Sequence, residues 1–199
     1  MFMLSNMNTQ AQKYIFFLHN RYLQEFGLES VHAEYGKVEY QEILSAFKKH
    51  KFNVISEVRP KNTNWQDYTQ KVKNQIDSLL TIGIKPYHIT VVGTSMGGYI
   101  AQAVSSLLKN KSINYVFIGC CSDEDSSDPN SPVFYGRVLS IHEKSDALAG
   151  SCMKMKEKAG SNVTKFKEIE LNNGLKHGFL YKALPQWLEP TIRWAKGED

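Results

Sequence analysis

Short apolar runs alternate along this chain with longer segments in which apolar residues recur at helical spacing. The runs are rich in aromatic and β-branched residues, as buried strands are, and cover residues 14–18, 53–58, 88–92, 114–118, 136–142 and 165–171. The segments between them are amphipathic and predict helices over residues 40–49, 65–82, 96–108, 153–158 and 184–194. This alternation predicts an α/β fold, a mostly parallel sheet of about six strands with helices on both faces.

The length of the chain, 199 residues, fits one such domain. We expect this domain to cover residues 13–199. The residues before it, 1–12, are expected to form a flexible polar leader, because they lack the basic and apolar regions of a cleaved signal peptide.

Charge and hydropathy argue against two classes of partner. The net charge of +4 is spread along the chain, and the longest basic cluster, residues 48–51, stands at the end of a predicted helix, where cations are favourable. Neither a second basic cluster nor a base-stacking motif accompanies it. The apolar run at residues 14–18 is far shorter than the roughly 20 residues of a membrane-spanning helix. We therefore expect no nucleic-acid partner and no membrane segment. The cysteines, as thiols of a reducing compartment, add the expectation of a cytoplasmic location.

The three cysteines show no metal or redox spacing. Cys120, Cys121 and Cys152 make an odd count without the pattern of a zinc site or a CxxC pair. They predict buried or half-buried thiols in a reducing compartment. The sequence also lacks H-E-x-x-H, a phosphate-binding loop and a dinucleotide fingerprint, so we expect neither a metal nor an organic cofactor.

The most informative segment is Gly93-Thr94-Ser95-Met96-Gly97, which reads Gly-x-Ser-x-Gly. It follows a predicted strand directly and precedes a predicted helix directly, the context in which this motif makes a sharp turn that exposes a nucleophilic serine. Glycines two residues away on each side leave room for such a turn. The alternative is a glycine-rich turn that binds phosphate or simply packs closely.

With this motif in this context, the chain resembles the α/β-hydrolase family over about residues 13–195. The resemblance implies a compact serine hydrolase without a lid domain, whose triad follows the order serine, acid, histidine along the chain. Two histidines follow Ser95, namely His142 and His177. His142 precedes the acids of its own loop, which is the wrong order. The resemblance therefore implies Ser95 as nucleophile and His177, in a polar loop before the last helix, as general base.

The acid of the triad has three candidates. Asp146 follows the fifth predicted strand, where the family places the carboxylate that orients the histidine. Asp123 follows the fourth strand, the position that a minority of the family uses. Glu143 is expected to lie too close to the end of its strand to turn towards a distant loop. Asp146 is favoured, and Asp123 is kept as the alternative.

An oxyanion hole needs two backbone N–H groups near the nucleophile. The resemblance implies Met96, the residue after the nucleophile, as one donor. The second donor comes from the loop after the first strand, where Asn20 stands in place of the family's usual glycine, so either Asn20 or Arg21 is expected to supply it. His19, in the same loop, is expected to hold the loop rather than to catalyse.

Two segments bear on the substrate. Residues 119–132 stand where many relatives insert a lid, and they are short, acidic and loop-like, which predicts an open site. The charges of Glu57 and Arg59 follow the second strand and could line a pocket, pair with each other or be solvated.

These observations together favour a serine esterase or thioesterase that acts on a small molecule through an acyl-enzyme on Ser95. Two alternatives remain. One is a hydrolase of amide or carbon–carbon bonds, because the same constellation serves many chemistries. The other is a catalytically silent protein of the same fold that binds a small molecule or a partner.

Overall fold

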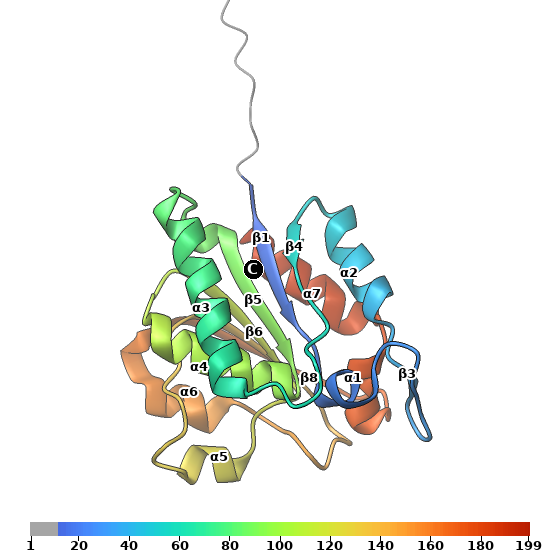
Figure 1. The fold of residues 1–199 in the computed structure, drawn as a ribbon. Helices are drawn as coiled ribbons and strands as arrows, with labels where there is room; N and C mark the ends of the chain where they lie inside the picture. The colour runs from blue at the N-terminus through green and yellow to red at the C-terminus, as the bar shows by residue number, and fades with distance from the viewer. Residues whose placement is uncertain (1–11) are drawn as a thin grey trace, which may run out of the picture.

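A six-stranded parallel sheet forms the centre of the computed structural model, which describes residues 12–199 (Figure 1). The strands follow the order β4-β1-β5-β6-β7-β8 across the sheet. Their bounds are β1 Tyr14–Leu18, β4 Asn53–Ile55, β5 Ile89–Thr94, β6 Asn114–Ile118, β7 Gly136–Glu143 and β8 Val163–Leu171. The predicted parallel sheet is confirmed.

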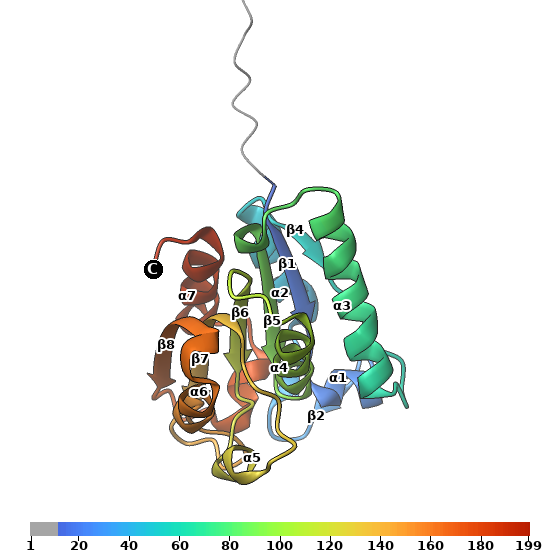
Figure 2. The ribbon, with the colours of Figure 1, turned by 90° about the vertical axis from the view of Figure 1, so that its left-hand side faces the viewer.

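Helices cover both faces of this sheet (Figures 1 and 2). On one face lie α1 Arg21–Phe26, α2 Tyr40–Lys49 and α7 Pro185–Lys196. On the other lie α3 Trp65–Thr81, α4 Met96–Leu108 and α6 Met153–Ala159. Successive strand residues point to opposite faces, so Ile15 and Phe17 pack with the first set of helices while Phe16 and Leu18 pack with the second. The sheet is therefore buried on both sides, which explains the nearly continuous apolar runs in the sequence.

The second predicted strand is shorter than expected. It ends at Ile55 rather than at residue 58. β4 is an edge strand that pairs only with β1, and beyond Ile55 the side-chain hydroxyl of Ser56 donates to the carbonyl of Phe17 at 2.6 Å. The chain leaves the sheet at this point and carries Arg59 into the interior.

Several short elements were not predicted. These are the helices α1 and α5 Asp123–Ser127, a hairpin of two short strands, β2 Val31–His32 and β3 Gly36–Lys37, and three 3-10 helices, η1 Pro86–His88, η2 Gly160–Asn162 and η3 Lys176–Tyr181. They are too short to show a period in the sequence. Capping residues do mark α1, since the Asn20 side chain accepts from the Leu23 amide at 3.0 Å and Gly27 ends the helix with φ of 80°.

Between β6 and β7 the described chain contains only α5 and loops, so no lid domain covers the sheet there. The predicted leader, apart from Gln12, lies outside the described residues. None of the helices in residues 12–199 combines the length and apolarity needed to cross a lipid bilayer.

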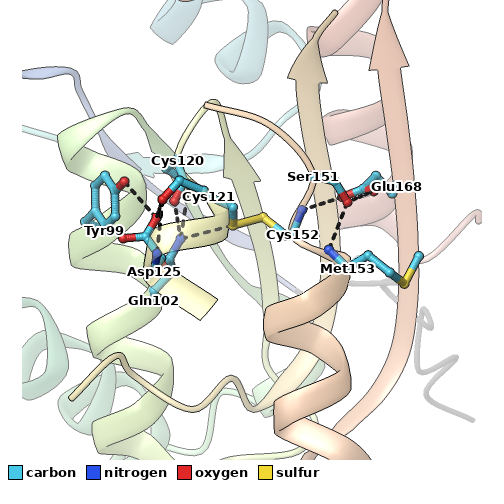
Figure 3. The surroundings of a disulfide bond; sticks show 10 residues. Tyr99, Gln102, Cys120, Cys121, Asp125, Ser151, Cys152, Met153 and Glu168 are labelled. Atoms are coloured by element: carbon cyan, nitrogen blue, oxygen red, sulfur yellow. Dashed lines mark hydrogen bonds between the residues drawn. A yellow bond between two sulfur atoms is a disulfide. The ribbon is translucent and has the colours of Figure 1, made fainter. Parts of the chain in front are cut away.

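The prediction of unpaired thiols is wrong for two of the three cysteines. Cys121, just after β6, forms a disulfide with Cys152, just before α6 (Figure 3). The two Cα atoms are 5.2 Å apart, although 31 residues separate them in sequence. Cys120 is free and buried, and burial raises the pKa of its thiol to about 12. The argument for a reducing compartment, which depended on unpaired thiols, loses that support.

Candidate active site

The turn between β5 and α4 holds Ser95 in a strained backbone conformation. Its φ of 49° and ψ of −119° are rarely adopted by a residue with a side chain. The neighbouring glycines permit this turn: a Cβ at Gly93 would collide with the backbone of Gly97, and a Cβ at Gly97 would collide with the carbonyl of Leu18. The Ser95 amide donates to the carbonyl of Ile118 on β6 at 2.9 Å. The serine is thus fixed by backbone packing at the carboxyl edge of the sheet.

Ser95, His177 and Asp146 lie in a hydrogen-bonded chain. The Nε2 atom of His177 is 3.0 Å from Ser95 Oγ, and its Nδ1 atom is 2.6 Å from Asp146 Oδ2. The Asp146 side chain is fully buried, and that of His177 is 13% exposed. Because a carboxylate only accepts, Nδ1 carries the proton and Nε2 is free to accept from the serine hydroxyl. The geometry suits proton transfer from Ser95 to His177.

The two rival residues lie elsewhere. Asp123 begins α5, where its side chain is 80% exposed and its carboxylate lies 2.8 Å from Lys154 Nζ. The Nε2 atom of His142 lies 3.3 Å from a carboxylate oxygen of Glu170 on the neighbouring strand, β8. Neither side chain takes part in the hydrogen bonds that link Ser95, His177 and Asp146.

Glu143, at the end of β7, has a role that the sequence analysis missed. Its buried carboxylate accepts from the amides of Asn173 at 3.0 Å and Gly174 at 3.3 Å, which belong to the loop before His177. The expectation that Glu143 cannot reach this loop is wrong. The register explains why, because Glu143 pairs with Leu171 at the end of β8 and the loop therefore starts beside it.

Hydrogen bonds outweigh burial at this carboxylate. Burial alone would raise the pKa of Glu143, but bonds donated by Asn173, Ser145 and Gly174 bring the pKa below its ordinary value. Ser145 extends the network, since its hydroxyl donates to Glu143 at 2.9 Å and accepts from the Lys176 amide at 3.1 Å. One anionic side chain and one hydroxyl thus tie the loop before His177 to the turn that carries Asp146.

The loop after β1 lies directly against the serine turn. The carbonyls of Leu18 and His19 are the groups that a Cβ at Gly97 would meet. Asn20 caps α1 with its side chain, and Arg21 is the first residue of that helix. Met96 is the first residue of α4, so its amide has no partner within the helix. The three predicted amide donors therefore lie at the N-termini of two helices, Asn20 and Arg21 at α1 and Met96 at α4.

A buried arginine holds this loop. The Arg59 amide donates to His19 Nε2 at 2.9 Å, which leaves Nδ1 to donate to the Asn20 carbonyl at 2.8 Å. The Arg59 guanidinium also donates to the carbonyls of His19 and Asn20 and, at 2.8 Å, to the Gln24 side chain.

Burial sets the protonation of this cluster. Burial first, and then the charge of Arg59, lower the pKa of His19 to about 3, so His19 is a neutral part of the loop. Burial also lowers the pKa of Arg59, to about 10. Glu57 does not pair with Arg59 but forms an exposed ion pair with Lys71. Of the two charged residues considered for a pocket, Arg59 holds the loop after β1 and Glu57 forms an ion pair on the surface.

The fold matches solved structures closely enough to be identified, although no protein-family model and no curated protein matches this sequence. Arabidopsis thaliana SOBER1 is 16% identical, with a TM-score of 0.59 over 94% of this chain and 99% of that one. An esterase/lipase from an uncultured bacterium is 15% identical, with a TM-score of 0.65 over 94% and 76%. EstE5, soaked with p-nitrophenyl butyrate, is 16% identical, with a TM-score of 0.63 over 94% and 76%. The chain therefore has the α/β-hydrolase fold.

Proposed function

We propose that this protein is a serine hydrolase that cleaves a small ester or thioester through an acyl-enzyme on Ser95. The observation that carries the proposal is the hydrogen-bonded chain Ser95, His177, Asp146 at the strained turn after β5. The esterase/lipase from an uncultured bacterium and EstE5 have the same fold, which supports hydrolysis of an ester as the reaction.

Acylation begins with proton transfer from the serine. His177 Nε2 takes the proton of Ser95 Oγ as the oxygen attacks the substrate carbonyl carbon. The buried Asp146 carboxylate holds the imidazole in the tautomer that can accept at Nε2, and it stabilises the imidazolium that forms. The imidazolium then gives its proton to the leaving alcohol or thiol, and the acyl group stays on Ser95.

The negative charge on the carbonyl oxygen needs donors during this step. We infer that the Met96 amide is one donor and that the amide of Asn20 or Arg21 is the other. Rigid peptide planes support this inference. Because Arg59 binds the carbonyls of His19 and Asn20, the amides of the following residues, Asn20 and Arg21, point the opposite way.

Water completes the cycle. His177, neutral again after the leaving group departs, accepts a proton from water, which attacks the acyl carbonyl and frees Ser95. The hydrolysis rate should rise with pH, because only the neutral imidazole takes the proton. All of these steps use side chains and backbone of this chain, so activity should survive EDTA and dialysis. Loss of activity with rescue by added zinc would contradict this mechanism.

Labelling with a fluorophosphonate probe tests the nucleophile. The wild-type protein should be labelled at Ser95, and Ser95→Ala should show neither labelling nor turnover while its circular dichroism is unchanged. Ser112→Ala, at an exposed serine beyond α4, is the matched control and should be labelled like the wild type. Labelling that persists in Ser95→Ala would refute the proposal, and a fully unlabelled wild type would favour a silent binding protein.

A panel of p-nitrophenyl esters, acyl thioesters and amides separates the reaction classes. We expect turnover of esters or thioesters, whose leaving groups are better than amines. Turnover confined to amides would assign the site to the alternative class of hydrolases.

A further inference from the structure

An apolar groove runs along α4, between α3 and the loop that leads to β7; Figure 2 shows the two helices side by side. It has a volume of about 600 Å³, within the range of small-molecule sites. Asn130 and Pro132 line one wall, and Trp65, Met96, Tyr99, Ala103 and Leu107 supply most of the apolar surface. Uncharged polar side chains complete the lining, namely Gln66, Thr69, Gln70 and Ser106. From Met96 to Leu107 the groove follows the helix for roughly 16 Å.

The groove lacks charge. None of the side chains that line it within the described chain is ionised at neutral pH. A smaller cavity of about 280 Å³ on the other side of Met96 and Trp65 contrasts with it, because Arg21, Glu25 and Arg59 are among its lining residues. An alkyl chain would enter the first space and avoid the second.

Fixed contacts hold the wall beside residues 130–132. The hydroxyl of Tyr99 donates to the carboxylate of Asp125 at 3.0 Å (Figure 3). The hydroxyl of Ser122 donates to the same carboxylate at 2.8 Å. The adjacent residue, Cys121, is anchored by the disulfide to Cys152. The segment that leads to this wall is therefore fixed at Cys121 by the disulfide and at Asp125 by two hydroxyl groups.

The groove reaches the residue next to the candidate nucleophile. Met96 lines its first part and directly follows Ser95 in the chain. The leaving group must lie near His177 Nε2, from which it takes its proton. No residue of the histidine loop, 172–182, lines the groove, whereas Met96, the proposed donor to the carbonyl oxygen, does. We therefore place the acyl part of the substrate, not the leaving group, in the groove.

We propose that this groove binds an unbranched alkyl chain, so that the substrates are esters or thioesters of medium-chain fatty acids. The proposal rests on the proposed function, because the chain is positioned by its carbonyl at Ser95. A groove of roughly 16 Å holds an acyl chain on the order of ten carbon atoms, because each C–C bond of about 1.5 Å advances an extended zig-zag by somewhat less than its own length. The alkyl chain gains by leaving water along Tyr99, Ala103 and Leu107.

The test is a series of p-nitrophenyl esters from acetate to decanoate, with kcat/KM measured for each. In the wild type, decanoate should exceed acetate by at least about tenfold, because each methylene that leaves water contributes. In Ala103→Phe, which fills the middle of the groove, the decanoate-to-acetate ratio should fall by about tenfold or more. Ser78→Phe, at an exposed position of α3 outside the groove, is the matched control and should keep the wild-type ratio.

A wild-type ratio near one, or an unchanged ratio in Ala103→Phe, would overturn the groove and leave ester hydrolysis at Ser95 intact. If the wild type hydrolyses no ester and Ser95 takes no label, the proposed function fails, and this inference fails with it. Should Ala103→Phe be unfolded by circular dichroism, Leu107→Lys decides, since Leu107 is 49% exposed and tolerates a charge. Leu107→Lys should then lose decanoate turnover relative to butyrate turnover, and an unchanged ratio would overturn the groove.

Discussion

The two halves of the candidate site are held by different forces. Ser95 is positioned by its own segment, where glycines at 93 and 97 let a strand turn directly into a helix. His177 and Asp146 instead lie in separate loops after β8 and β7, and the Glu143 carboxylate joins these loops. The position of Ser95 therefore depends on the absence of side-chain atoms, whereas the positions of His177 and Asp146 depend on a buried charge. The two halves should fail in different ways.

The largest effect is expected in the serine turn. In Gly97→Ala the new Cβ would overlap the carbonyl of Leu18, so the turn and the loop after β1 cannot both keep their positions. We expect a loss of stability of about 3 kcal/mol or more together with loss of activity. Thermal unfolding and ester turnover measure both. Gly150→Ala is the control, because nothing lies within 4 Å of a Cβ there, and a large loss in that variant would remove the argument from backbone packing.

Neutralising the acid should cost nearly as much activity but little stability. Asp146→Asn still fills the site but favours the wrong imidazole tautomer, and the same change in a serine protease lowers kcat about 10⁴-fold. Asp123→Asn should keep near-normal turnover, because Asp123 is exposed and paired with Lys154. The two variants are compared in one assay. The reverse ranking would transfer the acid to Asp123 and leave Ser95 and His177 in place.

Glu143→Gln should have an intermediate effect. The amide would present a donor to the amides of Asn173 and Gly174, so the histidine loop loses charge-assisted bonds. We expect kcat to fall about 10-fold to 100-fold, with KM changed little. Glu170→Gln, at a half-exposed carboxylate on the next strand, is the matched control. Equal losses in both variants would show that Glu143 does not position the loop.

The pH dependence of this carboxylate has a definite sign. Its pKa is lowered in the folded state, so its contribution to stability is present above the unfolded-state value, near 4.5, and is lost as the pH falls through the lowered value. Wild-type stability should therefore decline in this acidic window, and Glu143→Gln should decline less there. Parallel acid-unfolding curves for the two proteins would contradict this.

The smallest effect is expected at the surface of the same loop. Lys176, next to His177, forms an exposed ion pair with Glu34 at 2.8 Å. Exposed pairs contribute little to stability, so Lys176→Ala should change kcat/KM by less than about twofold. Double-variant measurements with Glu34→Gln check for coupling. A strong loss would show that the hairpin holds the histidine loop as firmly as Glu143 does.

What the sequence could and could not predict follows the same division. The serine turn was predictable because all of it lies in five consecutive residues, 93–97. The glycines at 93 and 97 are required there for steric reasons, so the motif can be recognised in the sequence. The four inner strands were predictable because each is an apolar run that is buried on both faces. Of the two edge strands, the one at residues 53–55 ended early, and β8 alternates charged and apolar residues.

Features that depend on distant neighbours were not predictable. The reach of Glu143 follows from the register of β7 with β8, and the burial of Arg59 follows from its bonds to the loop after β1. The pairing of Cys121 with Cys152 requires the ends of two parallel strands to be adjacent. Sequence spacing encodes none of these contacts directly.

The disulfide also gives the chain an unusual connectivity. Residues 121–152 form a covalent ring that contains all of β7 and the acid Asp146. A protease that cuts once in the exposed segment 127–130 would open the ring without separating the two pieces. On a denaturing gel, the cut protein should run as one species without reductant and as two fragments with it. A single cleavage in that segment, analysed with and without reductant, therefore shows whether the disulfide between Cys121 and Cys152 is formed in a given preparation.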